Sequence, residues 1–254
     1  MKHLKLRAMV ITLLASIAML VIACGAGRTD SPELPAATDL RLYVFDCGTL
    51  KADPARFRLK PEEVATTDLS VPCFLVVHPQ GRLIWDSGAV PDADWTPTGG
   101  PVTHHLVLPD GGERDLTLRK PLVAQLAEAG YSPADVSYLA FSHYHYDHTA
   151  NANAFASATW LVRQVERDAM FAEKPPGVMQ PGYYSALKNS KTVIIPASDD
   201  YDVFGDGTVI MKFASGHTPG DAIEAFLTKT GAQLWIQHDH VGNSRLKKAP
   251  EYYD

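Results

Sequence analysis

The feature that most constrains this chain is a buried strand that runs directly into three histidines and an aspartate. The apolar stretch "VSYLAF" (136–141) predicts the strand, and "HYHYDH" follows one residue later. In an extended segment, residues two apart point to the same side. His143 and His145 can therefore bind one metal ion, while Asp147 and His148 turn towards a second. Core histidines or an ordinary polar loop would rarely show this spacing, so the sequence predicts a metal site at a strand end.

The ligand types indicate the metal and the chemistry. Imidazole and carboxylate groups without thiolates suit Zn²⁺, and they also suit iron or manganese. A structural zinc site is usually closed by four protein ligands, commonly cysteines, whereas this set leaves room for water. We therefore expect a hydrolytic site, in which the metal lowers the pKa of that water to about 7 and supplies hydroxide. Asp147 is the candidate catalytic residue, because it could orient the nucleophile and accept or return its proton.

Apolar and alternating runs predict more strands than helices in the rest of the chain. The helices are expected to fall between groups of strands, which predicts sheets covered by helices in an α+β fold. The region 92–113 is expected to be a long irregular insertion. The predicted strands are 41–46, 73–78, 82–86, 136–141, 158–162, 192–196, 208–214 and 232–237, and the predicted helices are 120–130, 164–171 and 221–231.

The first 39 residues differ from the rest of the chain. Three cationic residues precede an apolar run over 9–23, which predicts a signal peptide (1–23). The run ends in "VIAC", similar to a bacterial lipobox, so we expect Cys24 to carry lipid. An ordinary signal peptide and a short membrane anchor are the alternatives. Residues 24–39 are then a lipidated flexible tether, and 40–254 the folded domain.

This N-terminus predicts a location at the bacterial cell envelope. The protein would face the periplasm and contact the membrane through its lipid anchor. Gly25 after the cysteine resembles the sorting signals of outer-membrane lipoproteins. The net charge of −6, with no basic run beyond the first seven residues, argues against a nucleic-acid partner. Cys47 and Cys73 could form a disulfide in an oxidising compartment or remain buried thiols, and the sequence leaves both open.

Several blocks of sequence resemble the metallo-β-lactamase superfamily. They are "WDSG" (85–88), "SHYHYDHTAN" (142–151), "SGHTPG" (215–220) and "WIQHD" (235–239). Three further blocks are similar to its N-acyl-homoserine lactonase-like branch: "LYVFDCGTL" (42–50), "ANANAFASATWLV" (150–162) and "KKAPEYYD" (247–254). The resemblance covers roughly residues 40–254. It implies an αββα sandwich with metal ions at the edge of the sheets.

The resemblance also implies ligand sets and a function. One metal would be held by His143, His145 and His217, and the other by Asp147, His148 and His238. Asp86 matches a recurring acid beside the metals, with a simple turn carboxylate as the alternative. The implied activity is metal-dependent hydrolysis of lactone or ester bonds, most directly of N-acyl-homoserine lactones (quorum quenching). The alternatives are a degenerate metal-binding lipoprotein, or a β-lactamase, thioesterase or phosphotriesterase.

The chain departs from the family pattern after Gly220. Family members continue from "GHTPG" through two strands that carry a metal-bridging aspartate and a tyrosine. Here Gly220 joins Asp221 and the predicted helix 221–231 directly, so the C-terminal half should be short of two strands. Asp221 suits the N-cap of that helix better than a replacement bridge between the metals. We expect a weak second metal site, close to one metal ion per chain, and weak lactone hydrolysis.

Overall fold

The structure, a computed structural model, describes residues 39–254 except 198, 215, 220–221, 229–230 and 233–234. The predicted signal peptide, the lipidation site Cys24 and nearly all of the tether lie outside the described residues, as does Asp221. Among the described residues, no helix combines the length and apolar character needed to cross a membrane.

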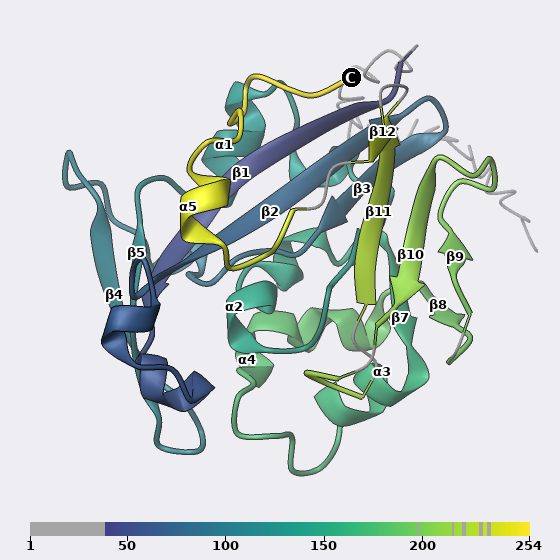
Figure 1. Ribbon diagram of the computed structural model, residues 1–254. Helices are drawn as coiled ribbons and strands as arrows, with labels where there is room; N and C mark the ends of the chain where they lie inside the picture. Colours follow the sequence, from purple (N-terminus) through teal and green to yellow (C-terminus); the bar gives the residue numbers. More distant parts are fainter. Residues whose placement is uncertain (1–38, 198, 215, 220–221, 229–230, 233–234) are drawn as a thin grey trace, which may run out of the picture. The chain divides into compact units, whose positions relative to one another are not determined.

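Two β-sheets form the framework of the domain (Figure 1). The large sheet has the order β4-β5-β1-β2-β3-β6-β7-β8, and the small sheet the order β12-β11-β10-β9. The strands are β1 (Arg41–Lys51), β2 (Asp68–His78), β3 (Gly81–Trp85), β4 (Val102–Val107), β5 (Glu113–Leu118), β6 (Tyr138–Ala140), β7 (Thr159–Arg163), β8 (Thr192–Ile195), β9 (Tyr201–Asp202), β10 (Val209–Phe213), β11 (Ala222–Thr228) and β12 (Gly231–Ala232). The α-helices are α1 (Leu122–Glu128), α2 (Tyr146–Thr149), α3 (Gln164–Met170), α4 (Pro181–Tyr184) and α5 (His240–Asn243).

Strand direction in the large sheet brings distant segments to one edge. Strands β3, β6, β7 and β8 run parallel, whereas β2 is antiparallel to β3. Because the carboxyl ends of parallel strands meet at one edge, the segments that follow β3, β6 and β7 lie close together. The beginning of β2 reaches the same edge, since that strand runs in the opposite direction.

Both faces of the large sheet are buried. Successive strand residues point to opposite faces, so Phe45 of β1 enters one hydrophobic cluster and Val44 the other. The first cluster includes Leu126 of α1 and Met170 of α3, and the second includes Met211 of β10. Helices therefore cover one face and the small sheet covers the other. This layering confirms the predicted α+β fold.

Most predicted elements are present, but the insertion 92–113 is more regular than expected. It contains β4 and reaches into β5, and the two strands pair antiparallel from Val102 opposite Leu118 to Val107 opposite Glu113. The turn between them follows from the local sequence "PDGG", because Gly111 adopts a positive φ of 83° that other residues rarely accept.

The predicted helix 221–231 is wrong. Within this segment Ala222–Thr228 form β11, which pairs antiparallel with β10 from Val209 opposite Phe226 to Phe213 opposite Ala222 (Figure 1). This pairing satisfies the backbone groups on the edge of β10 that faces away from β9, which would otherwise be exposed. Asp221 therefore precedes a strand, and the helix it was expected to cap does not form. Of the predicted strand 232–237, Ala232 belongs to β12 (Gly231–Ala232), 235–237 are not in a strand, and 233–234 lie outside the described residues.

A disulfide joins β1 and β2. Cys47 and Cys73 are bonded, with their Cα atoms 5.8 Å apart, and both residues are buried. Of the two states that the sequence leaves open, the structure has the disulfide. The bond lies in the hydrophobic cluster on the helix-covered face of the large sheet.

Candidate metal centre

The six predicted metal ligands converge at the edge where β3, β6 and β7 end. The loop that follows β6 carries His143 and His145, and the short helix α2 next to it carries Asp147 and His148. From the small-sheet side, the segment after β10 contributes His217 and the segment after β12 contributes His238. The candidate ligand atoms form two groups of three, and within each group all three lie within 4.8 Å of one another.

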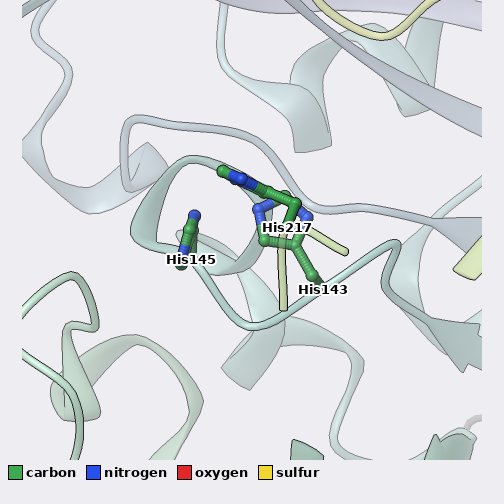
Figure 2. A group of neighbouring side chains, drawn as sticks. All are labelled: His143, His145 and His217. Carbon is green, nitrogen blue, oxygen red and sulfur yellow. The ribbon is translucent and has the colours of Figure 1, made fainter. Parts of the chain in front are cut away.

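The first group consists of three imidazoles. Its ring centroids are separated by 4.4 Å between His143 and His145, and His217 lies 4.6 Å from each of them. Figure 2 shows the three rings lying next to one another. Desolvation, together with the neighbouring histidines, holds the pKa of His143 well below its usual value and lowers that of His145 to about 4. Both rings are therefore neutral at pH 7, the form that binds a metal ion.

The first group also has an open side. His143 is buried and His145 half-buried, whereas His217 is exposed. An ion held here would be covered by the protein from the β6 side and reached by solvent from the side of His217. Three protein ligands with one accessible position are the arrangement of a catalytic metal site, whereas structural sites are closed.

The second group combines a carboxylate with two imidazoles. Oδ2 of Asp147 lies 3.4 Å from Nε2 of His148 and 3.6 Å from Nε2 of His238. Burial opposes ionisation of Asp147, but the adjacent histidines outweigh it and lower its pKa, so the group is a carboxylate. Burial also opposes the charge on His148, yet Asp147 and Asp86 together raise its pKa to about 10.

Hydrogen bonds turn both histidines of the second group towards Asp147. Nδ1 of His148 donates to Oδ2 of Asp86 over 2.9 Å, and Nδ1 of His238 donates to the carbonyl of Ser70 over 2.9 Å. The Nε2 atoms are thereby left as ligand atoms. Nε2 of His148 is buried, and no hydrogen-bond partner for it occurs among the described residues. A divalent cation fits this set, because it would satisfy that nitrogen together with the carboxylate.

Asp86 connects the two groups. It is fully buried at the end of β3 and accepts hydrogen bonds from the Ser142 backbone (2.7 Å), from His148 and from Gln237 (3.1 Å). The Ser142 hydroxyl lies 3.0 Å from Asp86 and 3.1 Å from Nδ1 of His143. Asp86 therefore supports both ligand groups and is more than a turn carboxylate. The supporting residues Ser142 and Gln237 are not predicted from the sequence, although each directly precedes a predicted ligand.

Glu166 is a second buried carboxylate that the sequence prediction missed. It lies in α3, which follows β7, and accepts hydrogen bonds from the Tyr144 backbone (3.1 Å) and the Thr218 hydroxyl (2.8 Å). It thus ties the loop of His143 and His145 to the segment that carries His217. One signal was available: Glu166 lies four residues before the buried Met170, so helical periodicity places it on the inner face of α3.

Comparisons with known proteins place this architecture in a family. The family described as the metallo-beta-lactamase superfamily matches residues 66–224, more than half of the chain. The chain belongs to the metallo-β-lactamase superfamily. Among its relatives, the N-acyl homoserine lactonase AttM of Agrobacterium fabrum is 33% identical over 198 residues, covering 76% of this chain and 72% of that protein. AttM of Azorhizobium caulinodans is 28% identical over 271 residues, covering 85% of this chain and all of that protein.

Solved structures of the superfamily share the fold. An N-acyl homoserine lactone hydrolase, solved with N-hexanoyl-L-homoserine at its catalytic metal centre, has a TM-score of 0.64 and 19% identity; the match covers 84% of this chain and 98% of that one. A variant of AiiA from B. thuringiensis, with N-decanoyl-L-homoserine at its active site, has a TM-score of 0.66 and 20% identity, with the same coverage. At these identities the likeness concerns the fold.

The length of one alignment bears on the predicted missing segment. The match to AttM of A. caulinodans spans 271 positions, but it includes only 85% of this 254-residue chain, or about 216 residues. About 55 positions of the relative therefore have no counterpart here. The matched part of this chain is shorter than that relative by this number of positions, and the loss of a segment after Gly220 stays a prediction.

Proposed function

We propose that this chain is a metal-dependent hydrolase that opens the lactone ring of N-acyl-homoserine lactones, an activity of the quorum-quenching type. The observation that carries the proposal is the pair of three-residue ligand groups, which adjoin through His143 and His148 with ring centroids 4.1 Å apart. Relatives that are 28% and 33% identical and are named N-acyl homoserine lactonases support the substrate class.

The two ligand groups define which residues would hold metal ions. His143, His145 and His217 would hold one ion, and Asp147, His148 and His238 would hold the other. Zn²⁺ suits both sets, as do iron and manganese. A bound dication would supply Lewis acidity towards the lactone carbonyl and a water of lowered pKa.

The protein's own residues would hold and orient the reactants. Asp147, kept ionised by its histidine neighbours, could take a proton from the water as its oxygen bonds to the lactone carbonyl carbon, and pass that proton to the alkoxide when the ring C–O bond breaks. Asp86 fixes His148, and the Ser70 carbonyl fixes His238, so neither ring is free to rotate. The substrate would approach from the exposed side of His217, because the opposite side is covered by buried residues of the β6 loop.

The missing segment leads us to propose weak activity and unequal metal affinity. In the family pattern that segment carries an aspartate that bridges the metals and a tyrosine near the substrate carbonyl. The three imidazoles of the first group form a complete open site by themselves and should bind the tighter ion. A degenerate metal-binding protein with little turnover is the second candidate, and the roughly 55 unmatched positions favour it.

We further propose that the mature protein is a lipoprotein of the bacterial cell envelope, anchored through Cys24. Two observations support export. The first 23 residues have the pattern of a signal peptide, and Cys47 and Cys73 are bonded in a disulfide, which is typical of proteins outside the reducing cytosol.

The test is hydrolysis of an N-acyl-homoserine lactone by the purified protein with and without zinc. We expect slow ring opening that requires zinc and is lost in His217→Ala. A matched control is His105→Ala, which removes an exposed histidine of β4 that pairs with Asp115 and belongs to neither ligand group. Zinc-loaded protein that opens no lactone would refute the proposal in favour of the degenerate protein. Faster turnover of a β-lactam, thioester or phosphotriester would reassign the substrate.

A further inference from the structure

A cavity of about 270 Å³ lies between α5 and the strands β1 and β2. None of the six candidate metal ligands lines it. Its volume is slightly below the range of about 300–1,000 Å³ that accommodates drug-sized ligands, so an occupant would be a small molecule. We call it the Arg119–Lys248 cavity, after the two cationic side chains in its wall.

The polar wall of this cavity has an excess of positive charge. Arg119 and Lys248 are opposed by one carboxylate, that of Asp46. Neither cation forms an ion pair with a carboxylate within the described part of the chain. Lys248 is half-buried and donates a hydrogen bond to the Asn243 carbonyl over 2.5 Å, and its burial lowers its pKa, with Asp46 acting in the opposite direction. The Lys248 ammonium uses one N–H in this bond and keeps its other N–H donors for an anionic ligand.

The rest of the wall is suited to an apolar group and to hydrogen bonding. Phe45, Val71 and Pro72 form the buried apolar floor of the cavity, and the methylene stems of Arg119 and Lys248 line it as well. His240 also lines the cavity, and its Nδ1 is a buried atom for which the described residues provide no hydrogen-bond partner. A ligand with one anionic end and one apolar end would match these two kinds of surface.

We propose that the Arg119–Lys248 cavity binds a small carboxylate with an apolar tail, of the size of a short-chain fatty acid. The carboxylate would accept hydrogen bonds from Arg119 and Lys248, since guanidinium groups match planar carboxylates in a two-point geometry. The tail would lie over this floor, beside the methylene stems of Arg119 and Lys248.

This site adjoins the second ligand group through one strand segment. Ser70, which lines the cavity, accepts a hydrogen bond from Asn243 at its hydroxyl (2.9 Å) and from His238 at its carbonyl (2.9 Å). Asn243 lines the cavity as well and also bonds the Gln237 carbonyl (2.8 Å). Occupancy of the cavity would therefore affect the position of His238, and a bound carboxylate should change the zinc affinity of the second group.

The test is calorimetric titration of the zinc-loaded protein with hexanoate, and with hexanol and acetate as controls that lack the charge or the tail. We expect hexanoate to bind at least about tenfold more tightly than either control, because both ends contribute. Arg119→Gln and Lys248→Gln should each weaken hexanoate binding about tenfold, as expected for the loss of a charge-assisted hydrogen bond. Arg245→Gln is the matched control, since Arg245 is an exposed cation of the same C-terminal segment that does not line the cavity.

The same titration contains the results that would overturn the proposal. Hexanoate could instead bind the zinc ions directly, and its affinity would then be unchanged by Arg119→Gln and Lys248→Gln. Equal binding of hexanol would show that no carboxylate is recognised. Because Arg119 is exposed, its substitution should leave the fold intact, which an unchanged zinc content and an unchanged thermal unfolding temperature would verify. These readouts are independent of whether the protein proves to be a lactonase.

Discussion

Substitution of Asp86 by asparagine should weaken metal binding without removing a metal ligand. The carboxylate accepts hydrogen bonds from Ser142, His148 and Gln237, whereas an amide offers only one oxygen and adds two donors. Loss of the charge-assisted bond to His148 is worth about 1.5–3 kcal/mol. Residues in this supporting position typically contribute a factor of about 10–100 to metal affinity, which is the same range of free energy.

The assay is competition of each variant with a zinc chelator, combined with thermal unfolding. For Asp86→Asn we expect zinc affinity to fall about 10–100-fold, mostly at the group of Asp147, His148 and His238. Asp92→Asn is a matched control. Asp92 is a half-buried carboxylate that accepts hydrogen bonds from the backbone of Leu122 and Val123 at the start of α1, outside the site.

Two results would refute this reasoning about Asp86. If Asp86→Asn binds zinc as tightly as the parent protein, the hydrogen bond to His148 does not support the ligand. If Asp92→Asn loses as much zinc affinity as Asp86→Asn, the loss reflects general destabilisation rather than the position of Asp86 beside the ligands.

Four further predictions follow from the site and the N-terminus. Glu166→Gln should lower zinc affinity at the first group by about tenfold, measured by chelator competition, because it loosens the segment that carries His217; an unchanged affinity would contradict this. His217→Ala should lose more zinc than His238→Ala in elemental analysis, and equal losses would show that the first site is not the tighter one. Zinc affinity at the second group should rise by up to about tenfold per pH unit from pH 6 to 8, because zinc must displace a proton from His148, whose pKa is raised to about 10. An affinity that does not change with pH would show that zinc displaces no proton there. Cys24→Ser should release the protein from the membrane fraction or stall its processing, and a mutant that stays mature and membrane-bound would argue against lipidation.

The four metal ligands that follow β6 could be located from the sequence because they are close neighbours in the chain. The apolar run before Ser142 and the spacing of His143, His145, Asp147 and His148 depend only on nearby residues. Likewise, the alternating residues of β1 and β2 are sufficient to predict strands. His217 and His238 required resemblance to a family, because nothing in their local spacing relates them to the β6 loop.

The missed features depend on tertiary contacts. Ser142 directly precedes a predicted ligand and Glu166 lies on the inner face of a predicted helix, but their hydrogen bonds form only when α3 and the ends of β3 and β6 meet. The sequence 221–231 has a helical pattern, but Ala222–Phe226 within it pair with β10 instead, and a pairing partner cannot be read from local periodicity. Prediction of the Cys47–Cys73 disulfide would have required knowledge of how β1 and β2 pair. Their antiparallel pairing brings the two Cα atoms to 5.8 Å.

The most direct test of the central claim is to measure lactone ring opening as a function of zinc bound per chain. The metal-free protein is titrated with zinc, and N-acyl-homoserine lactone hydrolysis and bound zinc are determined in the same samples. We predict that hydrolysis is absent without zinc, rises as the two ligand groups fill, and is abolished by His217→Ala at every zinc level. Protein with both groups filled and no detectable ring opening, or a rate independent of bound zinc, would contradict the account.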